Sequence, residues 1–242
     1  MSFIQYNGNV SEINKIIFEP LILEYEKDGV STIEITTNES NTIYFKFNLF
    51  ESIDSLETAQ QVAQQPLEHI INLLIYKYGY IVRQVELDRF NNQVFGYSRI
   101  TFSANETVGD NLEGLKIGLE DIELLNKLKT NMKFHLFKSA IYIQDPFGKF
   151  MFLYSILYDI LKNQNNVETF IKENHNGIEL RKRIKTNFDG NEKEVEETIF
   201  TWIRNHIGHT HTTTNMEEVK GNIDKYLQSL VNLVKKAIFL YG

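Results

Sequence analysis

Apolar and polar residues alternate between about residues 16 and 50, which is the pattern of strands with one buried face. Turn-forming residues interrupt the alternation at Lys27-Asp28-Gly29 and again at Asn38-Glu39-Ser40-Asn41. We therefore expect an antiparallel meander whose apolar side chains share one face: Leu21, Leu23, Ile33, Ile35, Ile43, Phe45, Phe47 and Leu49.

The following segment, residues 55–78, has a helical period instead. Pro66 is expected to start the second part of this region, and Gly79 suits its C-terminal cap. Strands near 81–89 and 94–103 and a short helix near 119–128 follow. Residues 1–138 are thus predicted to form a mixed domain of β-meander and helix.

The second half of the chain is predicted to be helical. Asp145-Pro146 starts a long apolar helix, and Asn165 with Glu168 has the capping-box spacing of a short one. Asn191 with Glu194 is expected to open a third helix, and Asn215 the last one. Residues 139–242 are therefore predicted to form an α-helical bundle, which makes the chain α+β.

Composition excludes several functions. The chain has no cysteine, so disulfides and zinc–thiolate sites are ruled out, and its net charge of −7 argues against tight nonspecific binding to nucleic acid. The N-terminus lacks the pattern of a signal peptide and no long apolar run is present, so we expect a cytoplasmic protein without a membrane partner.

The densest group of reactive side chains is Thr201–His211, which contains Arg204, Asn205, His206, His209 and His211. Arginine offers a permanent forked cation to phosphate oxygens, and histidine exchanges a proton near neutral pH. On one regular helix Arg204 and His209 would diverge by about 140°. Either the helix ends near Gly208 and redirects His209, or the two groups meet across two copies of the chain.

The order Arg204, Asn205, three residues, His209 resembles the signature of the HEPN family, specifically of Apea-like and toxin-type HEPN ribonucleases. The resemblance covers roughly residues 140–242 and includes the expected order of long, short, motif and long helices. In that family the polar group in the first long helix is usually glutamate; here Asp159 is the nearest candidate.

This resemblance implies a metal-independent endoribonuclease in toxin or antiviral defence, without a cofactor. His209 would act as general base or acid, Arg204 would stabilise phosphate charge, and Asn205 would orient the phosphate or hold His209, with His206 and His211 as accessory groups. It also implies a homodimer that joins two motifs through the helical half. The N-terminal half would then bind a regulatory ligand or protein.

A basic cluster at Arg181, Lys182, Arg183 and Lys185 has two interpretations. It is either a solvated helix face or a set of contacts to an RNA backbone. His69, His135 and His175 are expected to be structural histidines, because most histidines lie outside functional sites.

Two other functions stay open. His206, His209 and His211 could together hold zinc with an open water position. Alternatively, the helical half is a binding module for nucleotides, RNA or proteins, in which Arg204 and Asn205 only tie helix ends together.

Overall fold

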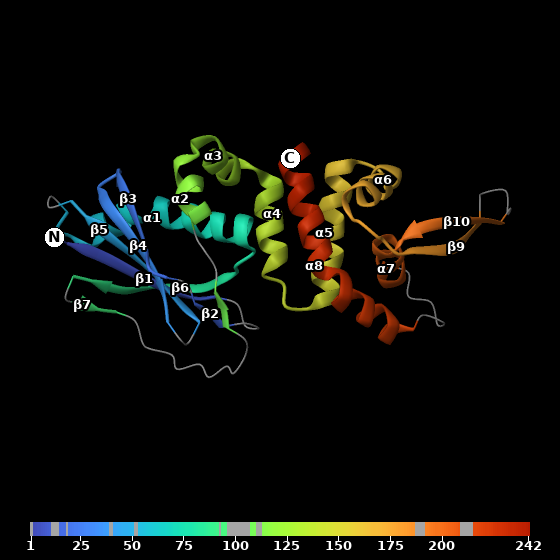
Figure 1. Ribbon diagram of the computed structural model, residues 1–242, viewed down its shortest axis with the longest axis horizontal. Helices are drawn as coiled ribbons and strands as arrows, with labels where there is room; N and C mark the ends of the chain where they lie inside the picture. Colours follow the sequence, from blue (N-terminus) through green and yellow to red (C-terminus); the bar gives the residue numbers. More distant parts are fainter. Residues whose placement is uncertain are drawn as a thin grey trace. The chain divides into compact units, whose positions relative to one another are not determined.

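The computed structural model describes residues 2–10, 15–17, 19–38, 41–50, 53–91, 93–95, 107–109, 113–186, 192–208 and 215–242. This part of the chain is mixed α+β, as expected from the sequence. It divides into two compact units, residues 1–130 and 131–242 (Figure 1). The expected boundary at residues 138/139 falls inside helix α4 (Met132–Ile141), because the buried side chains of α4 pack with helices of the second unit.

The first unit contains a sheet of six strands in the order β3-β4-β5-β1-β6-β7, with antiparallel neighbours. The expected meander is confirmed as β3 (Leu21–Lys27), β4 (Val30–Thr37) and β5 (Thr42–Leu49). Alternate residues of β5 are fully buried, and Gly29 takes a positive φ of 90° in the turn before β4. The period-two pattern therefore identified both the strands and the buried face.

Strand β1 (Phe3–Val10) was not expected, and it lies between β5 and β6 (Val82–Phe90) in the middle of the sheet. Its sequence contains Asn7, Gly8 and Asn9, so its apolar alternation is weak. β7 (Gln93–Val94) follows β6, and residues 96–103 of the expected second strand lie outside the described residues. A separate parallel pair joins β2 (Lys15–Ile17) to β8 (Thr107–Gly109).

Helix α1 (Leu56–Leu73) runs without interruption through Pro66, so the prediction that Pro66 starts a second helix is wrong. Proline removes one hydrogen bond from a helix, but Pro66 is buried in the contact face of α1. A π-helical turn, η1 (Leu74–Tyr78), extends the helix to Gly79, which forms the expected left-handed cap. Where one short helix was expected, there are two, α2 (Glu113–Glu120) and α3 (Ile122–Thr130).

The second unit is built around α5 (Pro146–Leu161) and α8 (Met216–Tyr241), which pack against each other (Figure 1). Helix α4 contacts both, and so does α7 (Ile199–Gly208). The predicted caps are present, because Asp145 accepts from the Gly148 N–H and Asn215 accepts from the second and third N–H groups of α8. Among the described helices, none has the length and apolarity needed to cross a membrane.

Two expectations for this unit are wrong. Helix α6 (Gln164–Asn174) is capped by Asn163, two residues before the expected Asn165, which frees Glu168 for contacts with other elements. The segment expected to begin the motif helix is instead a strand, β10 (Glu192–Thr198), paired with β9 (Leu180–Thr186). The second unit is therefore a helical core with a β-hairpin between α6 and α7, which projects from the helices in Figure 1.

Candidate functional site

The start of α7 is fixed by a carboxylate from another helix. Thr198, the last residue of β10, accepts a hydrogen bond from the Thr201 N–H at 3.4 Å, as an N-cap does. The Glu168 carboxylate of α6 in turn accepts from the Thr198 N–H at 3.0 Å and from both threonine hydroxyls. Glu168 thus occupies the place that a capping-box glutamate has within one helix, and it sets where the motif helix begins.

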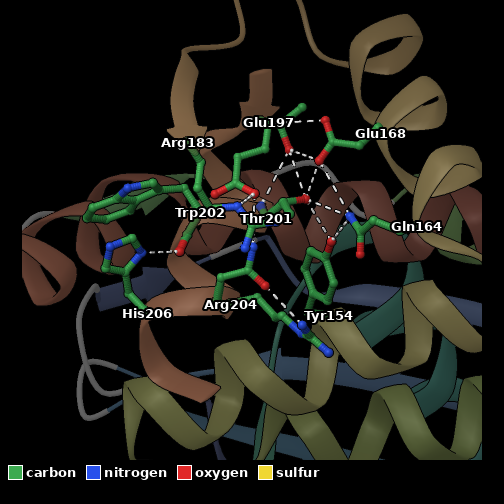
Figure 2. A network of polar contacts seen from close by, with 11 residues as sticks. Tyr154, Gln164, Glu168, Arg183, Glu197, Thr201, Trp202, Arg204 and His206 are labelled. Atoms are coloured by element: carbon green, nitrogen blue, oxygen red, sulfur yellow. Dashed lines mark hydrogen bonds and ion pairs between the residues drawn. The ribbon is translucent and has the colours of Figure 1, made fainter. Parts of the chain in front are cut away.

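Buried hydroxyl groups extend this network to α5 (Figure 2). The Tyr154 hydroxyl is 2.8 Å from that of Thr201, and the Gln164 side-chain amide donates to both oxygens at 2.7 and 2.9 Å. Tyr154 is 2% exposed, and this burial raises the pKa of its phenol. Helices α5, α6 and α7 are therefore joined by hydrogen bonds among the side chains of Tyr154, Gln164 and Thr201.

On the next turn of α7, two residues of the expected motif are hydrogen-bonded to each other. Arg204 donates an Nη1–H to the Asn205 Oδ1 at 2.9 Å, and Asn205 donates an Nδ2–H to the Glu197 carboxylate at 2.9 Å. The same Glu197 oxygen lies 3.2 Å from the Arg183 Nε. A chain of four side chains from β9, β10 and α7 thus ends at Arg204.

Glu197 is an unusual member of this chain because it is only 4% exposed. Burial raises its pKa most strongly, and the nearby charge of Glu168 adds to the rise, while Arg183 and the Asn205 hydrogen bond oppose it. The other carboxylate oxygen, Oε1, is buried and has no hydrogen-bond partner among the described residues. A buried carboxylate of this kind costs stability, so the fold retains an unfavourable group at the base of the hairpin.

Arg204 itself is half-buried, and no described carboxylate forms an ion pair with it. Only one of its five N–H groups donates to a described residue, the bond to Asn205. As far as the described residues go, the guanidinium has one fixed attachment, and its other donors remain for a ligand. A planar fork of this type matches two oxygens of a phosphate.

His206 lies on another side of α7, next to Trp202 (Figure 2). Its ring centroid is 3.9 Å from that of Trp202, and its Nδ1 is 2.8 Å from the Trp202 carbonyl. Because a carbonyl only accepts, Nδ1 carries the hydrogen, and Nε2 is the acceptor in the neutral ring. Arg204 is two residues earlier and about 200° around the helix, so the two side chains do not act on one small group.

The basic cluster does not form a helix face, because Arg181, Lys182 and Arg183 belong to β9. Arg181 pairs with Glu179 at 2.7 Å and with Glu218, Lys182 pairs with Glu194 at 2.8 Å, and Arg183 pairs with Glu197. Arg181 also lies over the Trp202 ring. Intramolecular carboxylates thus neutralise these three cations. Lys185 belongs to the same strand, and its side chain lies outside the description.

The remaining predicted site residues are not joined to Arg204. Asp159 of α5 forms ion pairs with Lys133 and Lys162, and within the described chain no hydrogen bond or ion pair links it to the motif. Helix α7 ends at Gly208, and His209 and His211 lie outside the described residues. No group of three potential metal ligands is found among the residues that the structure describes.

The three histidines expected to be structural lie in helices or at a helix end. His69 is buried in α1, and His135 lies in α4. His175 follows α6 and packs edge-on against Phe200, with its Nδ1 buried. All three are separate from the contacts around Arg204.

Sequence reasoning missed Glu197, Tyr154 and Gln164 as parts of this site, gave Thr201 no role beyond the first position of the candidate segment, and gave Glu168 only a local capping role. A signal for the hairpin was present, since Asp189-Gly190 is a turn dipeptide between a basic and an acidic segment. Opposite charges on paired strands stabilise a hairpin, and Arg181 does lie opposite Glu197 in the register. The contacts between helices had no comparable signal.

Comparison with protein-family models, with curated proteins and with solved structures finds no match for this chain.

Proposed function

We propose that the second unit is a metal-independent endoribonuclease of HEPN type, with Arg204 bound to the reacting phosphate. The observation that carries the proposal is that Arg204 is held by Asn205, yet no described carboxylate neutralises it. An arginine fixed in this way can stabilise charge on phosphate oxygens, and one such group contributes roughly 10²–10³ in rate. The order of α5, α6, α7 and α8, with the motif before the last helix, supports the resemblance.

The reaction is an internal displacement at phosphorus. A base takes the proton of the ribose 2′-hydroxyl, the O2′–P bond forms, and the P–O5′ bond breaks as an acid protonates the leaving oxygen. The products are a 2′,3′-cyclic phosphate and a 5′-hydroxyl. We assign the proton transfer to His209, one residue beyond α7. DNA lacks the 2′-hydroxyl nucleophile, so it is not cleaved.

Asn205 takes a narrower role than the resemblance alone implies. Its amide oxygen accepts from Arg204 and its nitrogen donates to Glu197, so both ends of the amide are occupied. We therefore assign Asn205 to holding Arg204. The expected symmetric dimer, the regulatory role of the first unit, and a place in toxin or antiviral defence belong to the same proposal.

The test is incubation of the purified chain with a mixed RNA pool in excess EDTA, followed by end-group analysis. We expect cyclic-phosphate ends from the parent and from Lys220→Ala, an exposed charge change on α8, and none from Arg204→Ala or His209→Ala. RNA binding without cleavage would replace the enzyme with a binding module. Cleavage that EDTA abolishes would favour the histidine-bound zinc, and cleavage retained in both variants would exclude this mechanism.

A further inference from the structure

The orientation of the Asn205 amide is dictated by the charge of Glu197. An ionised carboxylate can only accept hydrogen bonds, so the Asn205 group that faces it at 2.9 Å must be the NH₂ end. The amide oxygen then points to Arg204, whose guanidinium can only donate, at 2.9 Å. Each contact requires the other, and together they leave one orientation for the amide.

The charged groups around Glu197 come from three elements. Arg183 of β9 lies 3.2 Å from the carboxylate, and Glu168 of α6 and His206 of α7 act on its pKa through their charge. Glu168 disfavours the ionised form, whereas Arg183 and His206 favour it. Since Glu197 is nearly inaccessible to water, its ionisation depends on these neighbours and on Asn205.

We propose that Glu197 is a positioning residue whose ionised carboxylate holds Arg204 through Asn205, which makes the β9–β10 hairpin the element that orients the arginine. The inference rests on the ribonuclease proposed above, because it concerns the orientation of the same arginine. It assigns a function to the hairpin, because Arg183 pairs with Glu197 and Glu197 accepts a hydrogen bond from Asn205 of the motif helix (Figure 2). Protonation of Glu197 gives a neutral acid that can donate as well as accept, so the carboxyl no longer dictates the orientation of the amide, and its hold on Arg204 through Asn205 weakens.

Burial raises the pKa of Glu197 above that of an ordinary glutamate. The proposed change therefore occurs at a higher pH than the titration of exposed carboxylates. As the pH falls, the hold on Arg204 should weaken while most other carboxylates of the chain are still ionised.

The first arm of the experiment follows the Asn205 side-chain amide by NMR in the ¹⁵N-labelled full chain, assigned by its loss in Asn205→Ala. We expect its resonances to titrate with a midpoint above that of exposed glutamates. The titration should vanish in Glu197→Gln and persist in Glu196→Gln, which removes the same charge from an exposed neighbour on β10. The same measurement in His206→Gln separates the carboxylate titration from that of the imidazole.

The second arm measures RNA cleavage against pH. Glu197→Gln should lower kcat/KM by roughly 10- to 100-fold at neutral pH, mainly through kcat, since displacement of a reacting group by about 1 Å has effects of this size. Glu196→Gln should match the parent, and the acid limb of the profile should move with the Asn205 titration. Glu197→Asp, which keeps the charge, should recover part of the loss.

An Asn205 amide that does not titrate, or that titrates unchanged in Glu197→Gln, would overturn the proposal, as would full activity of that variant. If the parent chain cleaves no RNA, the proposed function fails, and the amide titration still decides whether Glu197 holds Asn205. If thermal melting shows that Glu197→Gln does not fold, the parent titration together with Glu196→Gln decides the question.

Discussion

Asn205 of the motif helix donates its side-chain amide to the buried carboxylate of Glu197, on the strand that precedes this helix, at 2.9 Å. The contact gives the asparagine a structural partner eight residues earlier in the chain. It also connects the hairpin to Arg204, because the other end of the amide accepts from that guanidinium. A motif that looks local in sequence therefore depends on β9 and β10.

Arg204→Lys should lower RNA cleavage by roughly 10²–10³ while the fold is retained. Lysine keeps the positive charge but lacks the planar fork that binds Asn205 and two phosphate oxygens at once. Single-turnover cleavage with circular dichroism as the fold control measures both effects. Activity within a factor of two of the parent would show that a point charge suffices.

Glu168→Ala should lower the free energy of unfolding of the second unit by about 2–3 kcal/mol, because hydrogen bonds to a charged acceptor are lost and their buried donors remain. The acceptor serves Thr198, Thr201 and Gln164. Urea denaturation followed by fluorescence reports on this unit, since Trp202 is the only tryptophan and lies in α7. Glu173→Ala, an exposed change on the same helix, should have little effect.

Tyr154→Phe should destabilise the second unit by about 1–2 kcal/mol, since the hydroxyl of Tyr154 contacts both Thr201 and Gln164 within the core. Tyr158→Phe is the matched control, because that side chain is on the same helix and is 41% exposed. Urea midpoints of the two variants provide the comparison. Equal midpoints would mean that the buried hydroxyl adds nothing to stability.

His69 should make the first unit less stable in acid. It is 6% exposed, neither ring nitrogen has a hydrogen-bond partner among the described residues, and burial lowers its pKa, with Lys129 acting in the same direction. The unfolded chain therefore binds this proton at a higher pH than the folded chain. The free energy of unfolding of the first unit keeps its full value above about pH 6.5 and declines as the pH falls below it.

His69→Leu should remove this decline and raise the stability of the first unit by about 1–2 kcal/mol, because an unpartnered polar group is no longer buried. His69 is the only histidine in residues 1–130, so the comparison isolates one group. Hydrogen exchange of the sheet amides at pH 7 and pH 5, measured in the full chain, follows this unit. An unchanged difference between the two pH values in the variant would contradict the assignment.

The sequence predicted those elements whose pattern is local. The period-two alternation of Ile43, Phe45, Phe47 and Leu49 identified β5 and its buried face, and the Asp145 and Asn215 caps identified the starts of α5 and α8. These signals are reliable because burial of every second residue and capping of free N–H groups act within a few residues. The candidate arginine and asparagine were found for the same reason, as neighbours in one short motif.

The other elements and the contacts around Arg204 depend on packing between segments that are distant in sequence. Residues 192–198 have the acidic composition of a helix start, yet they pair with β9, where opposite charges meet in the ion pairs of Arg183 with Glu197 and of Lys182 with Glu194. Helix α1 continues through Pro66 because burial of its contact face outweighs one lost hydrogen bond. Contacts such as Glu168 with Thr198, 30 residues apart, leave no periodic signal, since they depend on which helices pack together. Local residue order was therefore enough to indicate the groups capable of chemistry, whereas packing between elements fixes which of them are held in place.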